Sequence, residues 1–212
     1  MGNVGLLFVG AVLFMNGLLL LGKVDAKAGA VFNLFIGALQ VLTPTYLIFT
    51  ADNDPLKILA ASGIYLFGFT YLYVGIGLLA GLDSTGVGYY SLFVAIAALG
   101  YAFVNFRLLK DQPFGVIWLY WAFLWFLFFL LLGLKMNGHL RAYTGWVTAV
   151  QGWVTGVIPA GLLLSGYWKH PTEIAIALAA FGVLAFAGLW PLTRSRQPTP
   201  AARAAGSVSA PT

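Results

Sequence analysis

Three tryptophans in the fifth long apolar run of the chain share the spacing of one helical face. Trp118, Trp121 and Trp125 stand at positions i, i+3 and i+7, which a helix brings to the same side. Flat rings in a row can stack planar groups, and their faces accept weak contacts from N–H donors. Phe69 and Tyr73 form a similar i, i+4 pair in an earlier run. Such a stripe is also typical of simple packing, although close helix contacts favour small residues over bulky indoles.

Neutral polar side chains also fall inside the apolar runs. The amides of Asn16, Asn33 and Gln151 are examples. In hydrocarbon an amide that finds no hydrogen-bond partner costs free energy. Two interpretations therefore stay open. These amides join neighbouring helices, or they form a neutral hydrogen-bonding path for a neutral polar solute.

The chain lacks thiols, and it lacks charged residues in the middles of its apolar runs. The sequence has no cysteine, which excludes disulfides, thiolate metal sites and cysteine nucleophiles. The middles of the apolar runs contain no Asp, Glu, Lys, Arg or His, which disfavours proton pumps and ion-coupled carriers. A retinal protein would need a lysine in its last helix. No triad, metal cluster or carboxylate pair supports an enzyme, so we expect no catalytic residue, metal or cofactor.

The chain that carries these side chains is apolar almost throughout. It is 61% hydrophobic and 8% charged, whereas a soluble domain is about 25% charged. A membrane-crossing helix needs about 20 apolar residues, and seven runs qualify. They are Val4–Gly22, Ala28–Phe49, Leu56–Gly81, Gly88–Leu109, Pro113–Leu134, Tyr143–Gly166 and Ile174–Leu192. We predict an all-α polytopic membrane protein with seven transmembrane helices in a bundle.

The distribution of charge predicts the orientation of the chain. Seven of the eleven Lys and Arg residues fall on one set of alternate loops that includes the C-terminal end, and cytoplasmic loops carry such an excess. We expect the N-terminus outside and the C-terminus in the cytoplasm, and we interpret the net charge of +5 as this signal rather than as a nucleic-acid surface. Met1–Asn3 carries no Lys or Arg, so the first run is expected to remain a helix and not to be a cleaved signal peptide. The Pro-, Ala- and Ser-rich residues 194–212 are predicted to be a disordered tail.

Several strings, in matching order and spacing, resemble the AmiS/UreI family of urea and short-chain amide channels. The strings are Asn16-Gly17, Lys23-Val24-Asp25 with Lys27 and Asn33, Phe67 to Tyr73, Tyr90 to Ile96, Ile117-Trp118-Leu119 with Trp121 and Leu124-Trp125, and Ile158-Pro159-Ala160. Each string alone is weak, but together they are specific. The resemblance divides the chain into a six-helix channel core at 1–168, a seventh transmembrane helix at 169–193 that resembles the longer amide-transporter branch, and the tail.

The resemblance implies a narrow pore within each protomer of a hexameric ring, with lipid filling the centre of the ring, in a bacterial inner membrane. It implies urea or short-chain amides as permeants and a functional link to a cytoplasmic amidase or urease. An uncharged pore with aromatic slots suits small planar neutral solutes and offers an ion little in place of its hydration. The positions matching the pore lining are Leu6, Val9, Leu13, Phe69, Tyr73, Trp118, Trp121, Leu124 and Trp125.

Departures from the acid-gated member of this family indicate a channel without strong pH gating. The loop Thr50–Pro55 is short and lacks histidine, the residue type that titrates at about pH 6.5. The two histidines are His139, expected inside, and His170, expected outside. Gln151 aligns with a glutamate of that member, and Phe114 with one of its tryptophans. The alternatives are a proton- or ion-coupled amide transporter and a non-conducting seven-helix sensor or structural protein.

Overall fold

The structure, a computed structural model, describes residues 1–194, and this part of the chain contains helices and no strands. Seven helical segments are long and apolar enough to cross a membrane, as predicted. Their ends lie within four residues of the predicted ones. The segments are Gly2–Leu20, Ala26–Phe49, Pro55–Ala80, Thr85–Leu109, Gln112–Gly133, His139–Leu164 and Pro171–Arg194. The predicted tail lies outside the described residues, apart from Arg194, which ends the last helix.

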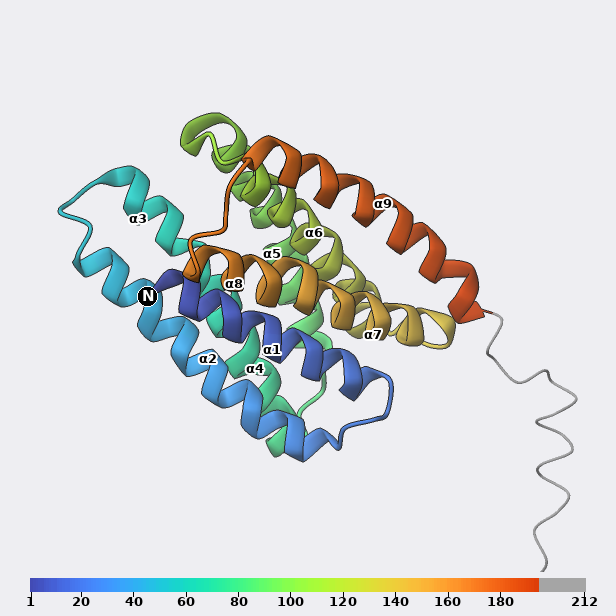
Figure 1. The fold of residues 1–212 in the computed structure, drawn as a ribbon. Helices are drawn as coiled ribbons and strands as arrows, with labels where there is room; N and C mark the ends of the chain where they lie inside the picture. The colour runs from blue at the N-terminus through green and yellow to red at the C-terminus, as the bar shows by residue number, and fades with distance from the viewer. Residues whose placement is uncertain (195–212) are drawn as a thin grey trace, which may run out of the picture.

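Several spans are built from more than one helical piece. The elements are α1 (Gly2–Leu20), α2 (Ala26–Phe49), α3 (Pro55–Ser62), α4 (Ile64–Ala80), α5 (Thr85–Val104), η1 (Asn105–Leu109), α6 (Gln112–Phe128), η2 (Phe129–Gly133), α7 (His139–Gln151), η3 (Gly152–Val157), α8 (Ile158–Leu164) and α9 (Pro171–Arg194). The three η segments are π-helical, a wider turn that often occurs at functional sites. Figure 1 shows the helices lying side by side in a bundle.

Three carboxylates sit at the starts of helices, where they accept hydrogen bonds from backbone N–H groups. Asp25 accepts hydrogen bonds from the N–H groups of the first turn of α2 at 2.9 and 3.1 Å. Asp54 does the same for α3 at 2.9 and 3.2 Å, and Asp111 caps α6 by accepting from the Phe114 N–H at 3.1 Å. Such caps stabilise a helix start, and they keep these charges out of the hydrocarbon.

Glycines allow α1 to pack backbone to backbone against the sixth span. A Cβ added at Gly17 would lie 2.6 Å from the Ala149 nitrogen, and one added at Gly152 would lie 2.6 Å from the Gly10 oxygen. Side chains at these positions would force the helices apart, as in small-residue interfaces of other membrane proteins. The Gly77–Gly81 spacing does not serve this purpose, because no atom of the described chain lies within 4 Å of a Cβ added there.

A pair of amides joins α1 to α2. The Asn16 and Asn33 side chains exchange two hydrogen bonds, of 2.9 and 2.7 Å, and Asn33 also donates to the Gly29 oxygen at 2.9 Å. Asn33 is fully buried. Of the two interpretations left open by the sequence, this geometry favours the helix-joining one for both residues.

The seventh span, α9, lies along the outer side of α6 and α7 (Figure 1). Only 11% of the most apolar stretch of this span is buried inside the protein, whereas 61% of the most apolar stretch of the α6 span is buried. Helix α9 is therefore peripheral, and α6 is the most enclosed helix of the bundle.

The amide pair gives a stability prediction. Asn33→Leu leaves the Asn16 amide without its partner, and an unsatisfied buried polar group costs about 1–3 kcal/mol. We expect Asn33→Leu to lower the free energy of unfolding, measured in detergent or lipid, by that order. The double substitution Asn16→Leu/Asn33→Leu should recover part of the loss. Equal stability of Asn33→Leu and the parent would show that this pair does not join the helices.

Candidate functional site

An aromatic cluster occupies the middle of the bundle. The Phe67 ring on α4 lies 5.8, 4.6 and 4.9 Å, centroid to centroid, from Trp118, Trp121 and Trp125 on α6. Its contacts with Trp121 and Trp125 are edge-to-face, the arrangement that aromatic pairs prefer. All four side chains are at least 94% buried. The predicted tryptophan stripe therefore faces the interior and meets a ring from the opposite helix.

The α4 residues of this cluster differ from the predicted pair. The ring of Phe69 is 49% exposed and stacks on Tyr65 at 5.6 Å, outside the cluster, and Tyr73 is 39% exposed. The interior positions are Phe67 and Tyr71, which are 3% and 1% exposed. They form another i, i+4 pair, two residues earlier and so on roughly the opposite side of the helix.

The glycines of α4 give a sequence signal for its buried face. Gly68 and Gly75, seven residues apart, mark one side of α4, and both contact the backbone of α2. At about 100° per residue, Tyr71 falls closer to that packed side than Phe69 or Tyr73 does.

A first cavity opens on the side of the N-terminus and reaches one face of the aromatic cluster. Its volume is about 280 Å³. We call it the Asp111 cavity. Its lining includes Gly2, Asn3, Leu6, Val9, Gln40, Phe67, Asn105, Asp111, Phe114, Trp118 and Trp121.

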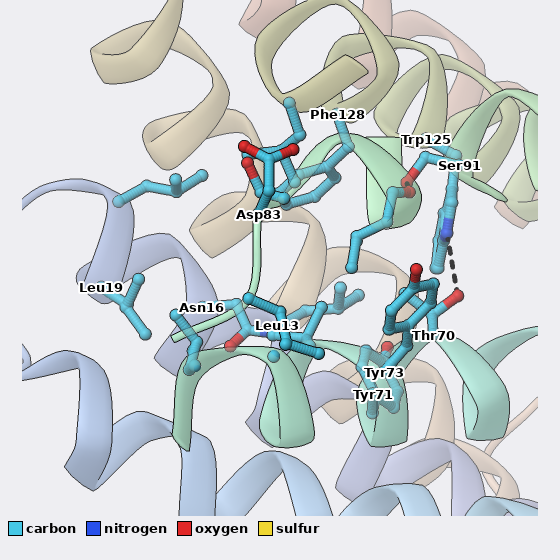
Figure 2. A pocket seen from close by; sticks show the side chains of 18 residues that line it. Leu13, Asn16, Leu19, Thr70, Tyr71, Tyr73, Asp83, Ser91, Trp125 and Phe128 are labelled. Carbon is cyan, nitrogen blue, oxygen red and sulfur yellow. Dashed lines mark hydrogen bonds between the residues drawn. The ribbon is translucent and has the colours of Figure 1, made fainter. Parts of the chain in front are cut away.

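A second cavity opens at the opposite end of the same helices and reaches Trp125 of the cluster. Figure 2 shows the side chains that line it. We call it the Asp83 cavity. Its volume is about 130 Å³, enough for several water molecules or a small amide. Its lining includes Leu13, Asn16, Thr70, Tyr71, Tyr73, Asp83, Ser91, Trp125 and Phe128.

Two helices show how thin the division between the cavities is. Along α1 the lining passes from Val9 in the Asp111 cavity to Leu13 in the Asp83 cavity, and along α6 it passes from Trp121 to Trp125. Four helical residues rise about 6 Å. We call the five side chains that separate the cavities the aromatic layer: Val9, Leu13, Phe67, Trp121 and Trp125. Leu124 is fully buried but lines neither cavity.

Neutral hydrogen bonds hold the indoles of the layer. The Trp125 Nε1–H donates to the Thr70 hydroxyl at 3.3 Å, drawn as a dashed line in Figure 2. The Trp121 Nε1–H donates to the Thr155 hydroxyl, in η3, at 3.0 Å. Both hydroxyls in turn donate to carbonyl oxygens of their own helices. The rings are therefore oriented without any charged group.

Two buried polar atoms near the layer have no hydrogen-bond partner among the described residues. They are the hydroxyl of Tyr71, a residue that lines the Asp83 cavity, and Oε1 of Gln151, whose amide nitrogen donates to the Tyr120 oxygen at 3.1 Å. Buried polar groups are normally paired with protein or water. Tyr71 can therefore bond a water or solute in the cavity.

Of the described residues that line the two cavities, the charged ones are Asp83 and Asp111. Asp83 accepts hydrogen bonds from Thr85 and an ion pair from Lys135 at 2.9 Å, which hold the pKa of that carboxyl well below its ordinary value. Burial raises the pKa of Asp111, and the Phe114 N–H partly offsets it. Within residues 1–194 there is no group of three His, Cys, Asp or Glu side chains that could hold a metal.

Comparison with known proteins agrees with this architecture. The model of the AmiS/UreI family transporters matches residues 1–167. A Rhodococcus erythropolis protein named as the transporter AmiS2 is 52% identical over 89% of this chain and 91% of its own. A Mycolicibacterium smegmatis protein named as a transporter of amidate substrates is 47% identical over 97% and 99%.

A solved structure extends the comparison to three dimensions. The urea channel of Helicobacter pylori, in a closed state, superposes with a TM-score of 0.71 at 35% identity, covering 79% of this chain and all of that one. At this level of identity and coverage the sequence and the fold point to the same relatives. The chain belongs to the AmiS/UreI family of transporters.

Proposed function

We propose that the protein is a passive, ion-excluding membrane channel for urea and short-chain aliphatic amides. The observation that carries this proposal is the pair of cavities that face each other across one aromatic layer inside a single protomer. The names of two relatives, a urea channel and a transporter of amidate substrates, support the same solute class.

The layer favours small, planar and neutral solutes. A flat amide can pass between rings that move apart by side-chain rotation, with its N–H groups against ring faces. The free Tyr71 hydroxyl can replace part of its lost hydration. An ion would have to give up its water at a layer of apolar and aromatic side chains, with nothing charged to compensate.

We assign the pore lining from the sequence and the cavities together. Of the positions expected from the resemblance, Leu6, Val9, Leu13, Trp118, Trp121 and Trp125 border a cavity, and Tyr73 borders the mouth side of the Asp83 cavity. Leu124 is fully buried but lines neither cavity, so we do not place it in the lining. Phe69 lines neither cavity and Phe67 takes its place, whereas Tyr71 is added beside Tyr73.

A coupled transporter is the less favoured function. Coupling to protons or ions generally needs a titratable or anionic group at depth, and the aromatic layer has none. The proposal also includes the expectations on assembly and context. These are a hexameric ring with lipid in its centre, an N-terminus outside the bacterial inner membrane, and an amidase or urease that consumes the solute.

Solute flux tests the channel function directly. Vesicles that contain the protein should swell or shrink faster than empty vesicles in gradients of urea, formamide or acetamide, and should show no added conductance to Na⁺, K⁺ or Cl⁻. Equal rates in protein-containing and empty vesicles would end the proposal. Accumulation of acetamide above its external concentration when a proton gradient is imposed would instead favour the coupled transporter.

A matched pair of substitutions tests the layer. An aromatic contact contributes about 0.5–1.5 kcal/mol, and a barrier change of that size alters a rate by about two- to tenfold. We therefore expect Phe67→Ala to change acetamide permeability or the acetamide-to-urea ratio to that extent. Phe69→Ala, two residues away on the exposed face, should leave both unchanged. The opposite pattern would return the pore lining to the Phe69 face.

The charges at the mouths predict a weak response to acid. Asp83 stays ionised through the physiological range because its pKa is lowered, and the aromatic layer contains nothing that titrates. Urea permeability should change little between pH 7.5 and pH 5. A steep activation by acid would contradict this prediction. A loss in acid that disappears in Asp111→Asn would trace the response to the raised pKa of that carboxyl.

A further inference from the structure

Helix α9 lines neither cavity, yet its backbone is tied to the helix that carries the tryptophans and to α7. The Tyr120 hydroxyl on α6 donates to the Leu178 carbonyl oxygen at 2.6 Å, and the Tyr143 hydroxyl on α7 donates to the Phe186 carbonyl oxygen at 3.1 Å. The two acceptors are eight residues apart, about 12 Å along α9. These are long-range contacts from two helices to one face of a third.

A third contact fixes the C-terminal end of α9. The Nε2 atom of His139, the first residue of α7, lies 3.0 Å from the Trp190 carbonyl oxygen and 3.0 Å from the Thr193 hydroxyl. The rings of His139 and Trp190 meet edge to face at 4.1 Å, and Tyr143 packs edge to face on the same indole at 5.0 Å. Helix α9 is thus held along its length and cannot slide freely on its neighbours.

The Tyr120 contact depends on a glycine. A Cβ added at Gly182 would lie 2.6 Å from the Tyr120 hydroxyl oxygen, closer than real Cβ contacts. Gly182 follows Leu178 by one helical turn, so the absent side chain leaves the Leu178 carbonyl open to the hydroxyl. The Tyr120 ring also packs edge to face on Phe186 at 5.2 Å.

From Tyr120 a short path of neutral hydrogen bonds leads back to the aromatic layer. The Tyr120 backbone carbonyl oxygen accepts from the Gln151 side-chain amide at 3.1 Å. The backbone carbonyl oxygen of Gln151 accepts from the Thr155 hydroxyl at 2.7 Å. That hydroxyl accepts the Trp121 indole N–H at 3.0 Å. Since Trp121 follows Tyr120 directly, a rotation of α6 about its axis would disturb both ends of this path.

We propose that α9 is a specificity clamp for the aromatic layer. By holding Tyr120 it fixes the rotation of α6, and the Trp121 indole then keeps the layer narrow enough to reject solutes that are not planar. Tyr120 and Gly182 act here as positioning residues, because neither borders a cavity. The inference rests on the proposed channel function and concerns a helix that lies beyond the family match, which ends at residue 167.

One substitution made at two places on α9 tests the clamp. Gly182→Leu displaces Tyr120, whereas Gly188→Leu points into space, where no atom of the described chain lies within 4 Å of an added Cβ. The measured quantity is the ratio of acetamide to glycerol permeability after the permeability of empty vesicles is subtracted from each, because this ratio does not depend on the amount of protein inserted. We expect this ratio to fall by about twofold or more in Gly182→Leu and to keep the parent value in Gly188→Leu.

A milder variant covers the case in which Gly182→Leu does not fold. Tyr120→Phe keeps the ring and removes only the hydroxyl, and it should lower the same ratio in the same direction. A parent-like ratio in Tyr120→Phe, together with a parent-like ratio in any folded Gly182→Leu, would overturn the clamp while the parent protein still conducts acetamide. A parent protein that conducts no acetamide at all would instead refute the channel function, and the clamp with it.

Discussion

Polar groups within the hydrocarbon thickness must find most of their hydrogen-bond partners inside the protein, and much of the structure follows from that constraint. Helices satisfy the backbone. Threonines such as Thr70 and Thr155 donate hydrogen bonds from their hydroxyls to backbone carbonyl oxygens of their own helices. The side chains of Asn16 and Asn33 pair with each other. The Tyr71 hydroxyl stays unpaired at a cavity, at the place where a polar solute would need a partner.

The same constraint explains how a neutral site can be selective. Close packing at Gly10, Gly17 and Gly152 brings α1 and the sixth span together backbone to backbone, so this side of the layer is stiff. The two indoles are held by Thr70 and Thr155. The selectivity that we propose therefore comes from shape and from weak polar contacts, with the charges kept at the mouths and at helix caps.

The sequence predicted the number and approximate ends of the spans, because apolar length is nearly sufficient to define a membrane helix. It also predicted the inward face of α6 from the tryptophan spacing. The aromatic spacing alone did not choose between Phe69–Tyr73 and Phe67–Tyr71, since both pairs have helical spacing, and the distinguishing signal lay in Gly68 and Gly75, which mark the side of α4 that packs on α2. The hydrogen bonds of α9 to Tyr120 and Tyr143 could likewise not be predicted from the sequence, because their acceptors are backbone carbonyl oxygens, which every residue has.

The central claim is that the solute path crosses the aromatic layer within one protomer, and the absence of native cysteine allows it to be tested by labelling. Val9 and Leu13 lie one turn apart on α1 but on opposite sides of the layer. In single variants Val9→Cys and Leu13→Cys, a charged, membrane-impermeant thiol reagent should block acetamide flux from one side of the vesicle for the first and from the other side for the second. Block of both from the same side, or modification without any effect on flux, would contradict the account.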